Sequence, residues 1–229
     1  KDGKAIRLTD KGNGKYTFTM TDGKVTVKAT FAKTESKPEP VSSFTDVNAD
    51  DWFAEAVQYV LDQGMMNGTS ATSFSPDATT TRGMIVTILH RLEGEPTAAA
   101  SDFSDVAAGT WYADAVAWAA ENGVVNGVSK TSFAPNAPIT REQLAAILFR
   151  YAQFKGYDVS VGEDTNILSY TDAGQISEYA IPAMQWACGA GVITGMGDGT
   201  LNPQGTATRA QVATMLMRFC ESVEYDAAA

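Results

Sequence analysis

The sequence predicts a mainly α-helical fold. Three helix-loop-helix repeats are expected to form a pseudo-threefold, three-pronged bundle, preceded by a small N-terminal β-hairpin or β-sandwich remnant. Two observations lead to this prediction. One series of residues recurs three times between residues 44 and 222, and each copy contains two stretches with helical hydrophobic periodicity. Residues 5–32 instead alternate between polar and apolar residues, as strands do.

Residues 1–33 are expected to form a β-hairpin that ends an upstream β-rich domain. Tyr16–Met20 and Val25–Phe31 flank a turn at Thr21–Lys24, which is a typical hairpin pattern. Two strands alone are marginally stable in water, so this segment should belong to a larger β-sandwich or pack on the body. Residues 34–42 are polar and contain prolines, which is typical of an extended linker. The chain opens without Met or an apolar signal region, so it reads as a fragment or a mature product.

The repeated series runs from an aromatic-Ser/Thr-Asp opening to a Thr-Arg pair. The copies are Phe44, Asp46, Trp52, Gly64, Gly68, Phe74, Pro76, Thr81 and Arg82; then Phe103, Asp105, Trp111, Gly123, Gly127, Phe133, Pro135, Thr140 and Arg141; then Tyr170, Asp172, Tyr179, Gly191, Gly195, Leu201, Pro203, Thr208 and Arg209. The first two copies keep an offset of 59 residues, whereas the third is displaced by 67 and then 68. We therefore place the repeats at 43–97, 102–156 and 168–223.

Each repeat is expected to contain two helices. The first runs from Ala54 to Gln63 in the first copy and is stopped by Gly64. The second starts at the Thr-Arg pair and carries an apolar stripe. The three stripes are Ile85, Ile88, Leu89 and Leu92; Leu144, Ile147, Leu148 and Tyr151; and Val212, Met215, Leu216 and Phe219. Because one helix pair cannot bury such a stripe, the three copies should pack their stripes around a common axis.

The charge distribution excludes several classes of protein. Residues 41–229 hold eight Lys and Arg against 22 Asp and Glu, a net charge of −14, so nucleic acid is a poor partner. Six of the eight basic residues occupy two repeat positions nine residues apart: Arg82, Arg141 and Arg209 at one, and Arg91, Arg150 and Arg218 at the other. No run of about 20 apolar residues exists, so membrane insertion is not expected.

Neither catalysis, a cofactor nor a metal is expected. The sole histidine, His90, aligns with apolar residues in the other copies and should occupy a partly buried helix position. The sequence shows no Gly-rich phosphate loop, nucleophile elbow or Cys/His metal spacing, and the acidic Asn48–Asp51 segment lacks the alternating ligands of a calcium loop. Cys188 and Cys220 are too few for a disulfide framework; Cys188 is expected in the core, and their pairing stays open.

The Thr-Arg pairs supply the first candidate binding residues, which are Thr81, Thr140, Thr208, Arg82, Arg141 and Arg209. The threonines suit helix N-caps, and Gln143 and Gln211 would complete capping boxes. The arginines fall in the first helical turn, where the macrodipole disfavours a cation by roughly 0.3–1 kcal/mol. A residue placed three times against local preference suggests a function.

Two interpretations of these arginines remain. An arginine fork beside free helix-start amides would form an anion site for a carboxylate or phosphate. Alternatively, each arginine forms an internal salt bridge with the aspartate of a repeat opening, Asp46, Asp105 or Asp172. On the first interpretation, replacing Arg141 by Ala should weaken binding without unfolding the protein, since a first-turn arginine contributes little to helix stability.

The same residues resemble those of S-layer homology domains, which share the aromatic-x-Asp opening, Trp, Gly-rich middle, Phe-x-Pro and an Ile-Thr-Arg-Ala-Glu signature. That signature stands here as Thr79-Thr80-Thr81-Arg82-Gly83-Met84, Ile139-Thr140-Arg141-Glu142-Gln143 and Ala207-Thr208-Arg209-Ala210-Gln211. The resemblance covers residues 44 to about 222. It implies a three-pronged spindle around a central three-helix bundle, with grooves that hold secondary cell wall polysaccharide of Gram-positive bacteria. It also implies that the signature arginine grips an acidic glycan end, often a pyruvate ketal on N-acetylmannosamine.

Aromatic residues would supply the other half of a sugar site, because their faces pack on pyranose rings. The candidates are Trp52, Trp111 and Tyr179. Trp118, with Tyr59 and Trp186 at equivalent positions, lies inside the first helix and is favoured as a core residue over a ligand platform. Asp46, Asp105 and Asp172 could orient the arginines or accept sugar hydroxyls, or could belong to an ordinary turn, and both readings stay open.

The chain also departs from the family pattern. The last Glu of the signature is Met84, Gln143 or Gln211, and its Ala is Gly83 in the first copy. Since Met84 cannot complete a capping box, the first copy's second helix should begin less firmly and its groove is the most doubtful. Two or three competent grooves fit this sequence.

The residues and the resemblance together imply a noncatalytic, secreted module at the cell wall, monomeric as this fragment. It should bind acidic secondary cell wall polysaccharide in grooves between repeats. The alternative is a structural surface-layer assembly module that acts by protein-protein contacts. A glycan hydrolase ranks last, because it needs a carboxylate pair about 5–9.5 Å apart and the repeated aspartates have no evident second member.

Overall fold

The computed structural model describes residues 9–10, 16–17, 44–161 and 166–226, and the chain divides into a unit of residues 1–37 and a unit of residues 38–229. In the first unit, β1 (Thr9–Asp10) pairs antiparallel with β2 (Tyr16–Thr17). The predicted turn at residues 21–24 and the strand after it lie outside the described residues.

In the second unit, two helices occur in each repeat, as the sequence predicts. The outer helices are α1 (Ala54–Asp62), α3 (Ala113–Glu121) and α5 (Ile181–Gly189). The inner helices are α2 (Arg82–Leu92), α4 (Arg141–Lys155) and α6 (Arg209–Asp226). Three short 3-10 turns precede α5, at Ile167–Ser169, Ala173–Gln175 and Glu178–Ala180.

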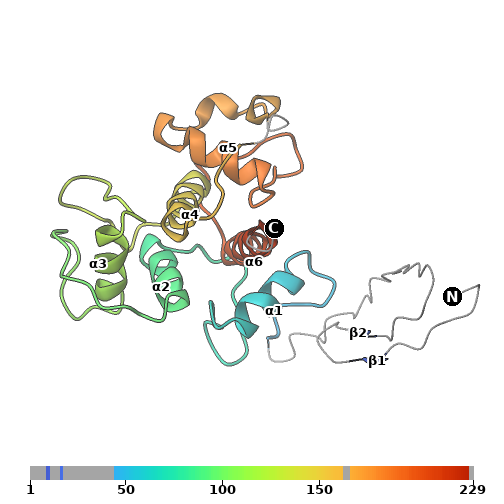
Figure 1. Ribbon diagram of the computed structural model, residues 1–229, viewed down its shortest axis with the longest axis horizontal. Coiled ribbons are helices and arrows are strands. Elements are labelled where there is room, and N and C mark those ends of the chain that lie inside the picture. The colour runs from blue at the N-terminus through green and yellow to red at the C-terminus, as the bar shows by residue number, and fades with distance from the viewer. Residues whose placement is uncertain (1–8, 11–15, 18–43, 162–165, 227–229) are drawn as a thin grey trace, which may run out of the picture. The chain divides into compact units, whose positions relative to one another are not determined.

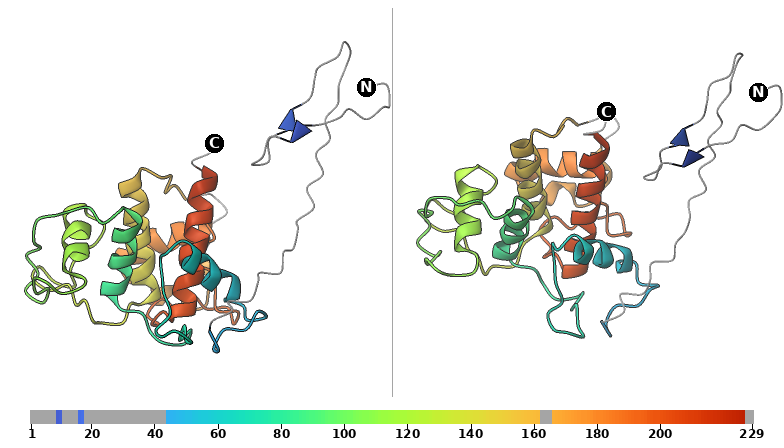
Figure 2. Two further views of the ribbon diagram at one scale, coloured as in Figure 1. Left: turned by 90° about the horizontal axis from the view of Figure 1, so that it is seen from below. Right: turned by 60° about the horizontal axis from the view of Figure 1, so that its bottom comes forward.

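The inner helices form the centre of this unit. Figure 1 looks along them, with α2, α4 and α6 surrounded by α1, α3 and α5, and both views of Figure 2 show the inner helices side by side. Their predicted stripes, except for Leu92, which is 36% exposed, fill one core, which includes Leu89, Leu144 and Leu216, all fully buried. The Tyr151 and Phe219 rings meet across the axis at 5.8 Å. This arrangement confirms the predicted three-pronged bundle.

The outer helices pack across repeat boundaries. The outer helix of each repeat lies on the inner helix of the repeat before it: α3 on α2, α5 on α4, and, closing the ring, α1 on α6. Aromatic contacts mark two of these interfaces, His90 with Trp118 at 5.5 Å and Phe149 with Trp186 at 5.6 Å. Trp118 and Trp186 are therefore core residues, and the ring contact accompanies the near-complete burial of His90, which was expected to be only partly buried. No repeat can bury its own apolar surface alone.

A closed triangle of backbone hydrogen bonds joins the three segments that precede the inner helices. The Thr80 amide donates to Ala207 O, the Ala207 amide to Ile139 O, and the Ile139 amide to Thr80 O. All three residues are fully buried. Among the described residues, the Thr80 hydroxyl is the one buried side-chain polar atom without a hydrogen-bond partner.

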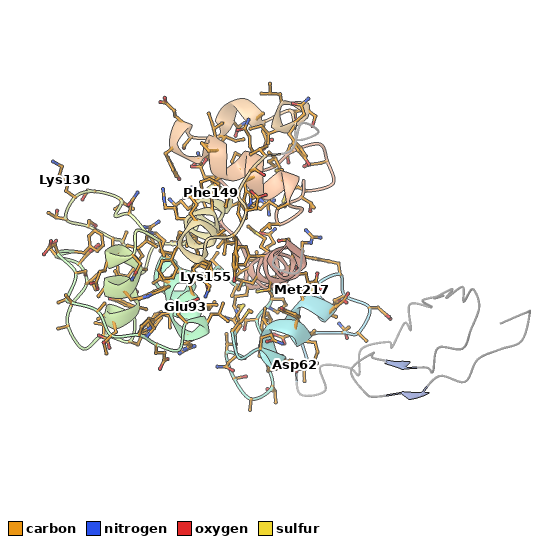
Figure 3. All side chains as sticks on the ribbon, viewed as in Figure 1. Asp62, Glu93, Lys130, Phe149, Lys155 and Met217 are labelled. Atoms are coloured by element: carbon orange, nitrogen blue, oxygen red, sulfur yellow. The ribbon has the colours of Figure 1, made fainter. Side chains whose placement is uncertain are left out.

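At the opposite end of the inner helices, α4 is linked to the end of α2. Glu93 Oε1 accepts from Tyr151 Oη at 2.6 Å and from Lys155 Nζ at 2.8 Å, and Figure 3 shows Glu93 beside Lys155. Burial and the Glu93 carboxylate raise the pKa of Tyr151, so its hydroxyl stays a donor. Cys188 and Cys220 are half-buried and form no disulfide.

Candidate functional site

The threonines of the Thr-Arg pairs cap the inner helices. Thr140 Oγ1 accepts from the Gln143 amide at 3.3 Å and Gln143 Oε1 accepts from the Thr140 amide at 3.4 Å. The third repeat forms the same capping box between Thr208 and Gln211. In the first repeat, Thr81 accepts from the Met84 amide at 3.4 Å and Met84 returns no bond. The predicted difference at the first helix start is therefore confirmed.

The first two backbone amides after each cap donate hydrogen bonds to carbonyls of the next repeat. The Arg82 amide donates to Ala137 O at 3.0 Å and the Gly83 amide to Pro135 O at 2.8 Å. The first two amides of α4 and of α6 donate to equivalent carbonyls in the same cyclic order. The expectation of free helix-start amides is wrong, because the neighbouring loop satisfies them before any ligand could.

The signature arginines are buried and bridge neighbouring repeats. Their exposed fractions are 5% for Arg82, 4% for Arg141 and 9% for Arg209. In each, Nε and Nη2 donate to two backbone carbonyls of the next repeat: Phe133 and Asn126 for Arg82, Leu201 and Thr194 for Arg141, Phe74 and Asn67 for Arg209. Two of the guanidinium groups also lie over phenylalanine rings, at 4.6 Å for Arg82 and 4.5 Å for Arg209. Each arginine thus has a structural role.

The repeated aspartates reach the arginines only through the backbone. Asp105 accepts from the Phe133 amide at 2.9 Å, from the Ala134 amide at 2.8 Å and from Ser132 Oγ at 2.6 Å. Asp46 and Asp172 hold the equivalent loops in the same way. No arginine-aspartate ion pair forms among the described residues, so the salt-bridge alternative is wrong in its literal form. Phe133 instead links the two side chains: its amide donates to Asp105 of its own repeat, and its carbonyl accepts from Arg82 of the repeat before.

These hydrogen bonds stabilise the ionised aspartate. Burial raises the pKa of Asp105, but the Ser132 hydroxyl and the Phe133 and Ala134 amides outweigh it, so the pKa is lowered overall. The pKa of Asp46 is lowered for the same reasons. The carboxylate also supports a strained turn, since Ala134 has a φ of 57° without being glycine.

A groove of about 370 Å³ opens beside Arg82, and we call it the Arg82 groove. It combines residues of all three repeats: Arg82 from the first, Arg150 from the second and Tyr179 from the third. The rest of its lining is Asn126, Gly127, Val128, Gln143, Ala146 and Ile147. The outer aromatic thus belongs to a different repeat from either arginine.

A second groove of about 310 Å³, the Arg141 groove, has the same construction one repeat later. Arg141, Arg218 and Trp52 take the places of Arg82, Arg150 and Tyr179. The rest of its lining is Thr194, Gly195, Met196, Gln211, Thr214 and Met215. The aromatic comes from the first repeat because α1 packs on α6.

Both grooves are cationic. Neither lining includes an Asp or Glu, although residues 41–229 carry a net charge of −14. Arg150 makes no hydrogen bond or ion pair with the described residues, and Arg218 Nη1 donates to Thr194 Oγ1 at 3.1 Å. Burial lowers the pKa of Arg82, Arg141 and Arg150, but arginine remains protonated in proteins. The grooves therefore suit an anion.

The third equivalent position, around Arg209, Arg91 and Trp111, is built differently. Arg91 Nε lies 3.8 Å from Glu95 Oε1. The cavity of about 330 Å³ found there includes Arg91 and Trp111 but also Glu95 and Asp114, and Arg209 does not line it. Nearby carboxylates thus offset the positive charge of Arg91 at this position.

The structure brings together only part of the predicted site. Of the predicted residues, Arg82 and Tyr179 meet in one groove and Arg141 and Trp52 in the other. The threonines are caps, and the aspartates bond the loops but line neither groove. The sequence analysis did not assign Arg150 and Arg218 to the site, although their repetition in a chain poor in basic residues was an available signal.

No group of three or more His, Cys, Asp or Glu in the part of the chain that is described could hold a metal ion. No helix in this part is both long and apolar enough to cross a membrane.

Comparison with known proteins identifies the repeats. The S-layer homology domain family matches three times, at residues 43–83, 102–145 and 169–213. The Surface-layer 125 kDa protein of Lysinibacillus sphaericus is 33% identical over 206 residues, which are 86% of this chain and 17% of that protein. An endoglucanase of Bacillus sp. (strain KSM-635) is 31% identical over 185 residues, or 81% of this chain and 19% of that enzyme.

A third relative is the amylopullulanase of Thermoanaerobacterium thermosulfurigenes, which is 28% identical over 201 residues, or 87% of this chain and 10% of that enzyme. The chain thus spans less than a fifth of the length of each of these relatives. The shared part is a noncatalytic module that surface-layer proteins and enzymes both carry. The chain belongs to the S-layer homology domain family, whose cell-surface modules bind cell wall polysaccharide and anchor proteins to the wall.

Proposed function

We propose that the Arg82 groove and the Arg141 groove bind the acidic, pyruvylated ends of secondary cell wall polysaccharide, and that the third position contributes no measurable binding. The observation that carries this proposal is the pair of arginines in each groove, with no carboxylate in the lining of a strongly acidic body. A protein that concentrates scarce cations beside a groove creates a favourable potential for an anion there.

The two arginines of a groove have different parts in this proposal. Arg82 already donates Nε and Nη2 to backbone carbonyls, so it contributes a fixed charge at the groove wall. Arg150 has no partner among the described residues, so its whole fork can donate to a carboxylate in the bidentate geometry that guanidinium favours. In the second groove Arg141 is likewise fixed by backbone carbonyls, and Arg218 donates only Nη1 within the described residues, to Thr194 Oγ1, so its other N–H groups can bind the carboxylate.

The remaining lining suits the rest of a pyruvate ketal. Such a ketal carries a methyl group beside its carboxylate, and the nearly buried Ala146 and Ile147 make part of the groove wall apolar. Tyr179 and Trp52 are both more than half exposed, so each can present a ring face to a pyranose. Two grooves on one rigid body would add avidity on a polymer that can span both.

Calorimetric titration with purified wall polysaccharide, before and after mild acid removal of the ketal, tests this proposal. Arg150→Gln and Arg218→Gln should each weaken binding, by about tenfold or more in the altered groove, because a charge-assisted bond contributes about 1.5–3 kcal/mol. The double variant should not bind. Arg91→Gln is the matched control and should bind as the wild type does.

The proposal fails if removal of the ketal leaves the affinity unchanged, or if the double variant binds normally. Self-association without polysaccharide binding, seen by analytical ultracentrifugation, would favour the alternative of a surface-layer assembly module.

A further inference from the structure

Each outer helix, with the residues just before it, forms one prong of the bundle. The third prong, which leads into α5, positions its groove-lining aromatic residue differently from the other two. Trp52 lies edge-on against the next residue, Phe53, with ring centroids 5.3 Å apart. Trp111 lies in the same way against Tyr112 at 5.0 Å. The residue after Tyr179 is Ala180, which offers no ring. A different contact must therefore hold Tyr179.

Glu142, the second residue of α4, makes that contact. It is 2% exposed. Its Oε1 accepts from Tyr179 Oη at 3.0 Å and from Ser177 Oγ at 2.8 Å, and its Oε2 accepts from the Ser177 amide at 2.9 Å. Three donors thus satisfy this buried carboxylate, and all three belong to the start of the third prong.

The equivalent positions on the other inner helices explain why only one carboxylate is present. At Gly83 of α2, an added Cβ would lie 3.0 Å from Pro135 O and 3.5 Å from the ring of Tyr112, so the neighbouring prong fills this space. Ala210 occupies the position on α6, which packs on the prong that carries Phe53. In two prongs a large aromatic residue, Tyr112 or Phe53, thus packs where the inner helix has a small residue. In the third prong the sizes are reversed, because Ala180 is small and the helix has Glu142.

We propose that Glu142 is a positioning residue for the Arg82 groove: its carboxylate holds the Tyr179 ring at the groove, in place of the aromatic contact that holds Trp52 and Trp111. This inference rests on the proposed function of that groove. Burial and Glu142 raise the pKa of Tyr179 to about 12, against the opposite effect of Arg82 and Arg150, so the hydroxyl remains a donor at neutral pH. The hydrogen bond from Tyr179 to Glu142 is therefore present at neutral pH.

The sign of the effect separates this role from simple electrostatics. Glu142 is bonded to Tyr179, which lines the groove, and a carboxylate at that place should disfavour a bound anion, so its removal would strengthen binding if charge alone mattered. If Glu142 positions Tyr179, its removal should weaken binding, because the freed side chain must be ordered again when the glycan binds.

The test uses the Arg218→Gln background, in which the Arg82 groove is measured alone with the pyruvylated polymer. Glu142→Ala and Tyr179→Phe should each weaken binding by about 3- to 10-fold, the cost of ordering one side chain. The two changes together should weaken it no further. Ala180→Phe combined with Glu142→Ala rebuilds the arrangement of the first prong and should restore affinity.

A matched control places Glu142→Ala in the Arg150→Gln background, where only the Arg141 groove binds, and the affinity should not change. Amide hydrogen exchange gives a readout without glycan, because Glu142→Ala should remove the protection of the Ser177 amide. Tyr179→Phe keeps the buried carboxylate and its Ser177 bonds, so it carries the test if Glu142→Ala does not fold. Unchanged or stronger binding by both folded variants would overturn the inference. Absence of binding even by the wild type would refute the proposed function instead, and this inference with it.

Discussion

Replacement of Arg141 by Ala should destabilise the protein, contrary to the expectation from its position in the helix alone. The truncation leaves Leu201 O without its buried donor, at a cost of about 1–3 kcal/mol. It also removes about 2 kcal/mol of packing by the buried side-chain methylenes. Thr194 O is only partly buried and can regain water. Together these effects lower the free energy of unfolding by about 3–5 kcal/mol, a large part of the 5–15 kcal/mol typical of a domain.

Urea unfolding followed by circular dichroism measures this loss. Arg150→Ala is the matched control, since this arginine lines a groove and has no hydrogen bond or ion pair with the described residues, and its change should stay within about 0.5 kcal/mol. Arg141→Met keeps most of the packing and should recover part of the loss. If Arg141→Ala unfolds within 1 kcal/mol of the wild type, the reasoning that these arginines bridge the repeats is refuted.

Three further predictions concern the framework of the grooves. Thr80→Val removes a buried hydroxyl without a partner and should raise the free energy of unfolding by about 1–2 kcal/mol, whereas a loss in a urea titration would indicate an unrecognised partner. The folded-state pKa of Asp105 lies below its value in the unfolded chain, so its contribution to stability is complete above about pH 4 and is lost as the pH falls through the folded-state pKa. Asp105→Asn should therefore be less stable at pH 7 and lose stability less steeply on acidification, and parallel pH profiles would contradict this. Gly127→Ala should destabilise strongly in thermal unfolding, because its Cβ would lie 2.3 Å from Ser129 O, and an unchanged melting temperature would refute the packing argument.

The helices could be predicted from the sequence because the repeat shows each local signal three times. The stripe that includes Leu89, Leu144 and Leu216 predicted the central bundle, and the Thr140 and Gln143 pair predicted a capping box that the structure shows. Such signals depend on residues close together in the chain, so periodicity and capping preferences reveal them.

The assembly of the grooves could not be predicted, because it depends on which repeat packs on which. The sequence predicted grooves between repeats but did not indicate which repeat supplies the aromatic residue beside each arginine. The structure places Tyr179 of the third repeat with Arg82 of the first, since each outer helix packs on the inner helix of the preceding repeat. The same cyclic exchange buries the arginines and occupies the helix-start amides that were expected to be free.

The first-turn position of Arg82, Arg141 and Arg209 correctly indicated an unusual role for these arginines. It did not reveal the contacts that explain their position. Their first-turn position does oppose the helix dipole, but two backbone carbonyls of the next repeat offset that cost. The arginines nine residues later sit in ordinary helical positions, so local preference did not mark them. Their repetition was a signal in the sequence, and the absence of carboxylates around Arg150 and Arg218 in the described part of the structure marks these two as groove residues.

The most direct test of the account is the affinity of the Arg150→Gln, Arg218→Gln double variant for pyruvylated wall polysaccharide, measured by calorimetry beside its free energy of unfolding. The account predicts a protein as stable as the wild type that no longer binds the polymer. A stable double variant that binds the polymer as tightly as the wild type would contradict it.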